Sequence, residues 1–367
     1  MKVIETGVIY ENPIPQLRSR QSMFPWLCKC GNGRLAAIHV IGEAFESADQ
    51  TSYIAFSDDE GKTWSKSIPM YDLSGFETEF SNCSKAVSLP DGRLIAIGYG
   101  FCRADKEKPV GNPETGGLLD DMVFYSISED CGKTWSSLTP IECSWGPHVE
   151  ASAPLTILKN GSLITPITGF PNWDGKMLGP LCGKALRSDD GGKTWSDSSI
   201  CMEFQGRNVT CYEQRMCQLD SGIIICIAWN ENVDTGERMP NHYTYSEDNG
   251  ITWSEPISTS IMGQASSVCA IGGERFLALH SIRRDTDKPG VYAYVVDFSD
   301  KQWNIVDECV AWEPVTPIIK DTKMAEIFSF LKFGQPGAIL LDNGDVLMSH
   351  WYAQEGQYKT VATRIKL

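Results

Sequence analysis

The sequence predicts an all-β protein: one six-bladed β-propeller domain over residues 1–367, with four-stranded antiparallel blades and a ring closed by the N-terminal strand. Three observations predict it. An eight-residue turn motif recurs along the chain, a second glycine turn recurs between its copies, and the chain begins with a strand that its last unit lacks. Self-similarity at a roughly fixed interval is typical of architectures built from repeated units.

The first turn motif has the pattern Ser-x-Asp-x-Gly-x-Thr-Trp. Its four copies occupy residues 57–64, 128–135, 188–195 and 246–253, and a degenerate fifth copy occupies residues 297–303. The aspartate can accept hydrogen bonds from backbone amides further along the turn, and the glycine supplies a positive φ. Each copy therefore predicts a tight hairpin in which the aspartate forms the turn and is not a catalyst.

The second turn lies between these copies and leads each time into an apolar strand. It occurs six times, at residues 32–33, 91–92, 160–161, 221–222, 272–273 and 343–344. Asn-Gly and Asp-Gly between apolar runs are the strongest short hairpin signals. Six such turns imply six blades, each with a glycine hairpin and an Asp-containing hairpin. The last unit has only three strands, so residues 3–10 are expected to complete it.

The composition of the chain limits the classes of ligand and the cellular location that we expect. The net charge of −15 opposes binding to nucleic acid or to anionic membranes, and it leaves a small molecule or glycan as the expected ligand. No apolar run is long enough to cross a bilayer, and the start does not have the form of a signal peptide. Thirteen scattered cysteines favour free thiols, so we expect a cytoplasmic protein. We expect no cofactor and no metal, because Cys28 and Cys30 are too closely spaced for a zinc site.

The Ser-x-Asp-x-Gly-x-Thr-Trp turns are of the kind called Asp boxes. A six-bladed propeller with such turns resembles the sialidases (neuraminidases) and their BNR-repeat relatives, and the resemblance covers essentially the whole chain. It implies a site in the central funnel, where the inner strands begin. Sialidases place there three arginines that grip the sugar carboxylate, an aspartate acid/base, and a tyrosine nucleophile paired with a glutamate. Asp boxes also occur in non-catalytic propellers, so they predict the fold and not an activity.

Carried over residue by residue, the resemblance implies that Asp49 is the acid/base and that Glu213 is the glutamate of the Tyr/Glu pair. Arg238 matches the second arginine, and Arg283 or Arg284 matches the third.

Two other family positions hold different residues. Met23 stands where the first arginine lies, and Gln335 stands where the tyrosine lies. Losing the phenol removes the covalent route that sialidases use. The resemblance therefore implies a chemistry other than ordinary sialidase hydrolysis.

An alignment of the inner strands on their glycine turns gives an independent set of funnel residues. It places there Gln21, Asn82, Glu150, Glu213, Gln264 and Gln335. Glycoside cleavage needs one carboxyl group that donates a proton and another group that attacks or activates water. The predicted catalytic residues are Asp49, Glu213 and Glu150. The predicted substrate-binding residues are Arg238, Arg283, Arg284, Gln335, His280, His350 and Gln264.

Each of these residues also has a structural interpretation. Inner-strand carboxylates can hydrogen-bond axial water, a histidine at a strand end can be a core hydrogen-bonding group, and Arg283–Arg284 with Asp285 can form a surface ion pair. Two functions therefore stay open. One is a glycoside hydrolase, or a polysaccharide lyase, that acts on a small or terminal glycan, acidic or neutral. The other is a non-catalytic propeller that binds a glycan or a protein.

Overall fold

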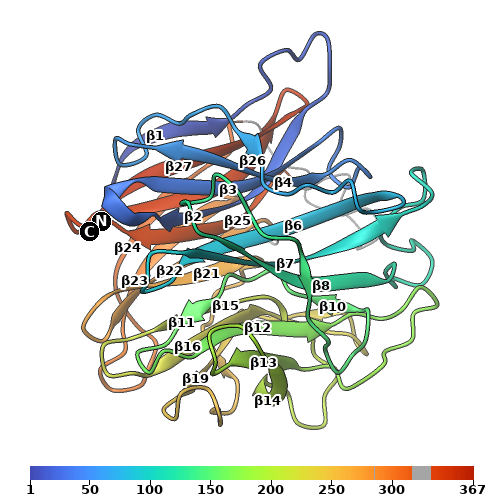
Figure 1. Ribbon diagram of the computed structural model, residues 1–367. Helices are drawn as coiled ribbons and strands as arrows, with labels where there is room; N and C mark the ends of the chain where they lie inside the picture. The colour runs from blue at the N-terminus through green and yellow to red at the C-terminus, as the bar shows by residue number, and fades with distance from the viewer. Residues whose placement is uncertain (285, 316–331) are drawn as a thin grey trace.

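A computed structural model describes residues 1–284, 286–315 and 332–367. Six antiparallel sheets follow one another around a ring, as the colour sequence in Figure 1 shows, and both termini lie side by side. This confirms the predicted six-bladed propeller. Across the described ranges, no helix is long and apolar enough to span a membrane.

The first three blades run from inner to outer strand in chain order. Blade 1 contains β2 (Gln21–Lys29), β3 (Leu35–Gly42), β4 (Thr51–Ser57) and β5 (Ile68–Pro69), with the short 3-10 turn η1 (Gly31–Gly33) after β2. Blade 2 contains β6 (Glu79–Ser88), β7 (Leu94–Arg103), β8 (Asp121–Ser128) and β9 (Thr139–Pro140). Blade 3 has a divided inner strand and contains β10 (Val149–Glu150), β11 (Thr156–Ile157), β12 (Leu163–Gly169), β13 (Gly183–Ser188) and β14 (Ser196–Met202).

The other three blades complete the ring. Blade 4 contains β15 (Tyr212–Gln218), β16 (Ile224–Trp229), β19 (His242–Ser246) and β20 (Ile257–Ser258), with a side hairpin of β17 (Glu231–Asn232) and β18 (Glu237–Arg238). Blade 5 contains β21 (Ser266–Gly272), β22 (Arg275–Ile282), β23 (Gly290–Asp297) and β24 (Asn304–Trp312). Blade 6 contains β25 (Phe333–Leu340), β26 (Val346–Gln354), β27 (Gln357–Lys366) and β1 (Lys2–Tyr10).

Blade 6 joins the two ends of the chain. The N-terminal strand β1 pairs antiparallel with β27, with Val3 opposite Ile365 and Val8 opposite Val361. The first strand therefore supplies the outer edge of the last blade, as predicted. Closure of this kind ties the ends of the chain together, so that no blade is left without both neighbours.

The Asp boxes are hairpins that the aspartate side chain closes. Asp59 Oδ1 accepts hydrogen bonds from Ser57 Oγ at 2.8 Å and from the Thr63 amide at 2.9 Å, while Oδ2 accepts from Thr63 Oγ1 at 2.6 Å. Equivalent bonds recur in the other three copies. The Thr63 donors lower the pKa of Asp59 to about 2. The aspartates are turn formers, as predicted.

The box glycines also join neighbouring blades. A Cβ atom at Gly61 would lie 2.5 Å from Leu347 of blade 6, and one at Gly132 would lie 2.6 Å from Ile54 of blade 1. Each hairpin therefore packs against the preceding blade at a distance that only glycine allows. Buried apolar clusters lie between successive blades in the same way, for example across blades 2 and 3.

Candidate functional site

Three inner strands share one irregularity. In β2, β15 and β25 the antiparallel ladder slips, and a non-glycine residue within each slip has a positive φ: 55° at Phe24, 46° at Glu213 and 44° at Gln335. A β-bulge re-aims a side chain out of the regular alternation. Left-handed backbone is strained for such residues, and strain of this kind gathers at functional sites.

The three bulges are also equivalent in sequence. Each bulged residue lies nine positions before the positive-φ glycine of the following turn, namely Gly33, Gly222 and Gly344. Phe24 is therefore the blade 1 counterpart of Glu213 and Gln335.

The predicted alignment was wrong in blade 1, where Phe24 and not Gln21 occupies the position equivalent to Glu213. Gln21 begins β2, and its Oε1 accepts a hydrogen bond from the Tyr358 amide at 2.7 Å. Asn82 is buried and binds the Ser52 amide at 3.2 Å. Met23, which stands in place of the family's first arginine, is fully buried.

Glu213 is the centre of the candidate site. Its carboxylate accepts hydrogen bonds from Gln335 Nε2 of blade 6 and from Trp229 Nε1 at 2.9 Å. Its backbone amide donates to both carboxylate oxygens of Glu150, each at 3.1 Å. Ser152 Oγ donates to Glu150 as well. Two glutamates from blades 3 and 4 are thus linked through one amide, and Gln335 joins them to blade 6.

The two glutamates differ in environment. Glu150 is only 6% exposed, whereas Glu213 is half-buried. Burial, and next the negative charge of Glu213, raise the pKa of Glu150 to about 7. Glu150 therefore carries a proton across most of the acidic range, while its partner keeps a solvent-facing carboxyl group.

Two cations lie beneath this pair. Arg215 Nη1 donates to Ser152 Oγ at 3.3 Å and to the Gln214 carbonyl at 2.7 Å. Lys85 Nζ donates to the Phe24 carbonyl at 3.4 Å. Each of these two cationic residues is 2% exposed, and burial lowers the pKa of Lys85 to about 8. The charges of both glutamates act on both cations. The layer under Glu213 is therefore a buried set of ionisable groups.

Blade 5 adds an arginine to the cluster. Arg283 Nε donates to Gln264 Oε1 at 2.8 Å, and its Nη1 donates to the Phe333 carbonyl at 3.0 Å. Burial lowers the pKa of Arg283 to about 10, and the charge of Glu213 opposes this shift. Of the predicted site residues, the structure thus brings together Glu150, Glu213, Gln264, Arg283 and Gln335.

Arg238 and Arg284 lie beside this group, at Glu231. Arg284 Nη1 is 3.8 Å from a Glu231 oxygen, and Arg238 pairs with Glu231 in the β17–β18 ladder. Glu231 follows Trp229, whose indole binds Glu213, by two residues. Both arginines are half-buried.

The structure does not bring His280, His350 or Asp49 into this cluster. Both histidines are 0% exposed inside their blades, and burial lowers the pKa of each to about 3. They are neutral core side chains; His280 Nδ1, for example, lies 2.8 Å from Asn241 Oδ1. Asp49 Oδ1 accepts a hydrogen bond from the Glu43 amide nitrogen at 3.0 Å, which holds the loop between β3 and β4 in place. Asp285 lies outside the described residues.

Aromatic rings border the cluster on the side of blades 1 and 6. We call Phe24, Phe45, Trp351 and Tyr358 the aromatic wall. Phe24 meets Phe45 at 5.4 Å and Trp351 at 6.0 Å, both edge to face, and Phe45 lies 6.0 Å from Tyr358. Trp351 is buried, and the other three rings are partly exposed.

Sequence reasoning missed Phe24, Lys85, Arg215 and Trp229 as parts of the site. The nine-residue spacing to the turn glycine would have found Phe24. Lys85 and Arg215 are basic residues in the interior of inner strands, which is a usable signal because such residues are seldom buried without a partner.

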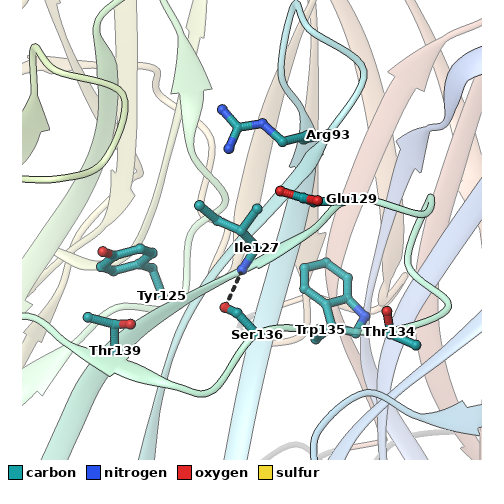
Figure 2. A pocket seen from close by; sticks show the side chains of 8 residues that line it. All are labelled: Arg93, Tyr125, Ile127, Glu129, Thr134, Trp135, Ser136 and Thr139. Carbon is teal, nitrogen blue, oxygen red and sulfur yellow. Dashed lines mark hydrogen bonds between the residues drawn. The ribbon is translucent and has the colours of Figure 1, made fainter.

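A separate pocket of about 490 Å³ lies on the rim, at the Asp box of blade 2 (Figure 2). Arg93 and Glu129 are its charged residues, and Arg93 is paired with Asp91 at 2.8 Å. It contains no pair of carboxyl groups, so the candidate site is the funnel cluster.

Within the part of the chain that the structure describes, no three His, Cys, Asp or Glu side chains gather as a metal site.

Known proteins support the same fold. The BNR repeat-like domain family matches residues 110–304, and the BNR/Asp-box repeat matches residues 55–66. A protein of unknown function from Dyadobacter fermentans has a solved structure that is similar at 17% identity and a TM-score of 0.75, over 100% of this chain and 99% of that one. No curated protein matches the chain.

Two sialidase structures are also similar. The Hadza microbial sialidase Hz136 shares 15% identity at a TM-score of 0.66, over 96% of this chain and 67% of its own. The intramolecular trans-sialidase from Ruminococcus gnavus shares 12% identity at a TM-score of 0.66, over 98% of this chain and 97% of its own. Likeness at this identity shows the fold alone. With more than half of its residues matched, the chain belongs to the BNR repeat-like domain family and has the sialidase-like six-bladed fold.

Proposed function

We propose that this protein is a glycoside hydrolase that acts on a small or terminal glycan at the funnel, with Glu213 as the carboxylate that meets the substrate. One observation carries the proposal. Glu213 sits on strained backbone, two donors fix its carboxylate, and it is half-exposed above a buried ionic layer. A carboxylate held in one orientation at a surface suits attack on a sugar or activation of water.

Glu150 supports Glu213 from below. Burial and the charge of Glu213 raise the pKa of Glu150 to about 7, so Glu150 holds a proton below that pH. Because Glu150 is nearly inaccessible, its proposed role is to position and tune Glu213. We propose Asp49 as the proton donor: it lies outside the cluster on the loop between β3 and β4, whose Phe45 contacts Phe24, and would reach a bound sugar from that side.

Gln335 shapes the reaction. A neutral amide is a poor nucleophile, so the reaction uses a carboxylate in place of a phenol. Gln335, Gln264 and the arginines Arg238, Arg283 and Arg284 then serve as hydrogen-bonding groups around the sugar.

The experiment is a screen of aryl glycosides, including the sialoside, with wild type and Glu213→Gln. We expect turnover of at least one glycoside and a loss of about a hundredfold or more in the variant. Glu129→Gln, on the exposed rim of blade 2, is the matched control and should keep full activity. Absence of turnover by the wild type, or equal rates for Glu213→Gln, would refute the proposal.

A second function has one specific observation in its favour. The carboxylate of Glu213 already accepts from both Gln335 and Trp229, an arrangement that also suits a fixed acceptor in a non-catalytic glycan-binding site. The same glycoside panel separates the two functions: saturable binding by calorimetry without any turnover would favour the binder.

A further inference from the structure

Blade 1 departs from the other blades at the residue that opens its glycine turn. The backbone amide of this residue donates to the carbonyl four positions further along the chain. In four other blades the residue is a buried leucine, namely Leu89, Leu158, Leu219 and Leu341. Blade 1 keeps the hydrogen bond, from Cys30 to the Arg34 carbonyl, but has a buried cysteine in place of the leucine. A thiol therefore occupies a core position that is otherwise aliphatic.

The Asp box of blade 2 has a second cysteine at a comparable point. The fourth residue of each complete box has a positive φ, and in three boxes it is Glu60, Gly191 or Asn249. Blade 2 has Cys131 there, at a φ of 63°. Left-handed backbone favours glycine and asparagine, and it does not favour cysteine. The geometry of the turn thus gives no reason for a thiol at this position.

These two cysteines contact each other across the boundary between blades 1 and 2. Cys30 Sγ donates a hydrogen bond to the Cys131 carbonyl at 3.7 Å. Burial, and next a hydrogen bond with the Cys131 thiol, raise the pKa of Cys30. Cys28 lies near both, in the same apolar cluster. Of the three thiols, Cys131 alone is partly exposed, so it is the one that a solute can reach.

We propose that Cys30 and Cys131 form a disulfide when the protein meets a hydroperoxide, and that this bond joins blade 1 to blade 2. Cys131 reacts first. Its thiolate sulfur bonds to one peroxide oxygen, the O–O bond breaks, and the departing hydroxide takes up the proton that the thiol lost. The sulfur of Cys30 then attacks the sulfenic acid: the S–S bond forms, the S–O bond breaks, and water leaves with the Cys30 proton. Two thiols and one hydrogen peroxide thus become a disulfide and two waters.

Contact between the two residues favours the second step. The raised pKa of Cys30 opposes it, because the thiolate is the attacking form. The fold, however, holds the two thiols together, which makes the attack intramolecular. Both turns follow strands that run away from the funnel, so the bond forms on the opposite face of the propeller. The inference therefore does not depend on the proposed function.

The test treats the purified chain with hydrogen peroxide, alkylates the remaining thiols after denaturation, and maps the peptides by mass spectrometry. We expect one main crosslinked pair, Cys30 with Cys131. Cys131→Gly and Cys30→Leu should each abolish it. Both variants are expected to fold, because other blades carry glycine and leucine at these positions. Thermal melts check that they do. Cys28→Ser should keep the crosslink.

The chain supplies two internal controls. Cys102 is exposed, and it should be oxidised without a crosslink inside the chain. Cys201 and Cys226 both donate to Gln214 Oε1, at 3.3 and 3.7 Å, but they are fully buried, so this pair should stay reduced.

Three results would overturn the inference. The first is recovery of Cys131 as a free thiol or a sulfinic acid under conditions that oxidise Cys102. The second is Cys28, in place of Cys30, as the main partner of Cys131. The third is an equal yield of a Cys201–Cys226 crosslink, because exposure at the boundary of blades 1 and 2 would then not decide the reaction.

Discussion

The substitution Glu150→Gln should make the protein more stable at alkaline pH while leaving it unchanged at acidic pH. Glu150 is buried, and its pKa is raised to about 7 by burial and by the charge of Glu213. Glutamine has nearly the same shape, and its carbonyl can accept the Glu213 amide. It stays neutral at every pH, so it removes the penalty of ionising a carboxyl group in this layer.

The size of the effect follows from the shift. The rise in pKa from the ordinary 4.5 to about 7 corresponds to about 3 kcal/mol, since one pKa unit is worth about 1.4 kcal/mol. The folded protein binds this proton more tightly than the unfolded chain does. The stabilisation is therefore complete below pH 4.5, declines as pH rises toward 7, and is absent above that. Glu150→Gln should recover up to about 3 kcal/mol of unfolding free energy at pH 8.

Urea denaturation at pH 5 and pH 8 measures this. Burial also raises the pKa of Glu46 to about 7 and that of Asp121 well above its ordinary value, so the wild type alone would mix at least three groups. The informative quantity is the difference between variant and wild type at each pH. For the control Glu129→Gln, at an exposed position, the difference in unfolding free energy from the wild type should be the same at pH 5 and at pH 8. If the Glu150→Gln difference is also independent of pH, the glutamate is not a buried proton acceptor and the reasoning fails.

Three further predictions concern the hairpins and the site. Gly132→Ala should cost more than Gly161→Ala, by about 1 kcal/mol or more in urea denaturation, because both have φ near 87° but only the first Cβ would meet another blade, at 2.6 Å; equal losses would rule out the interblade contact. Asp59→Ala removes three hydrogen bonds from an exposed turn and should lower the unfolding free energy by roughly 1 kcal/mol, and an unchanged melting temperature would contradict this. Trp229→Phe removes one donor to Glu213, the proposed catalytic carboxylate, and should lower kcat about tenfold with little change in KM; a pure rise in KM would place the indole in substrate binding.

The fold was predictable because its signals are local. The Asp box forms its bonds within seven residues, and the glycine turns need only a positive φ, so both are readable without neighbours. Counting six glycine turns gave the blade number. The missing strand of the last unit gave the ring closure that β1 and β27 make.

The candidate site could be predicted only in the blades whose inner-strand register could be read from the sequence. Glu213 and Gln335 were found because their bulges obey the same spacing to the turn glycine. In blade 1 the alignment missed the slip at Met23–Trp26 and selected Gln21 over Phe24. A shift of one residue in a strand reverses which face a side chain occupies. His280 and His350 were misjudged for a different reason: they were expected at the ends of second strands, but they lie within β22 and β26 and are fully buried.

The buried ionic layer is itself an argument for function. Burying charged pairs is often no better for stability than apolar packing, and the fold could close its axis with aliphatic side chains. This chain instead keeps Glu150, Arg215 and Lys85 under the one half-exposed carboxylate that strained backbone and two donors hold in place. Burying these ionisable groups costs desolvation free energy, and the rim pocket of blade 2 has no such buried groups. We infer that the layer serves Glu213. If Glu150→Gln stabilised the protein at pH 8 yet left ligand binding and turnover intact, the buried layer would have no role in the function of Glu213, and this argument would fail.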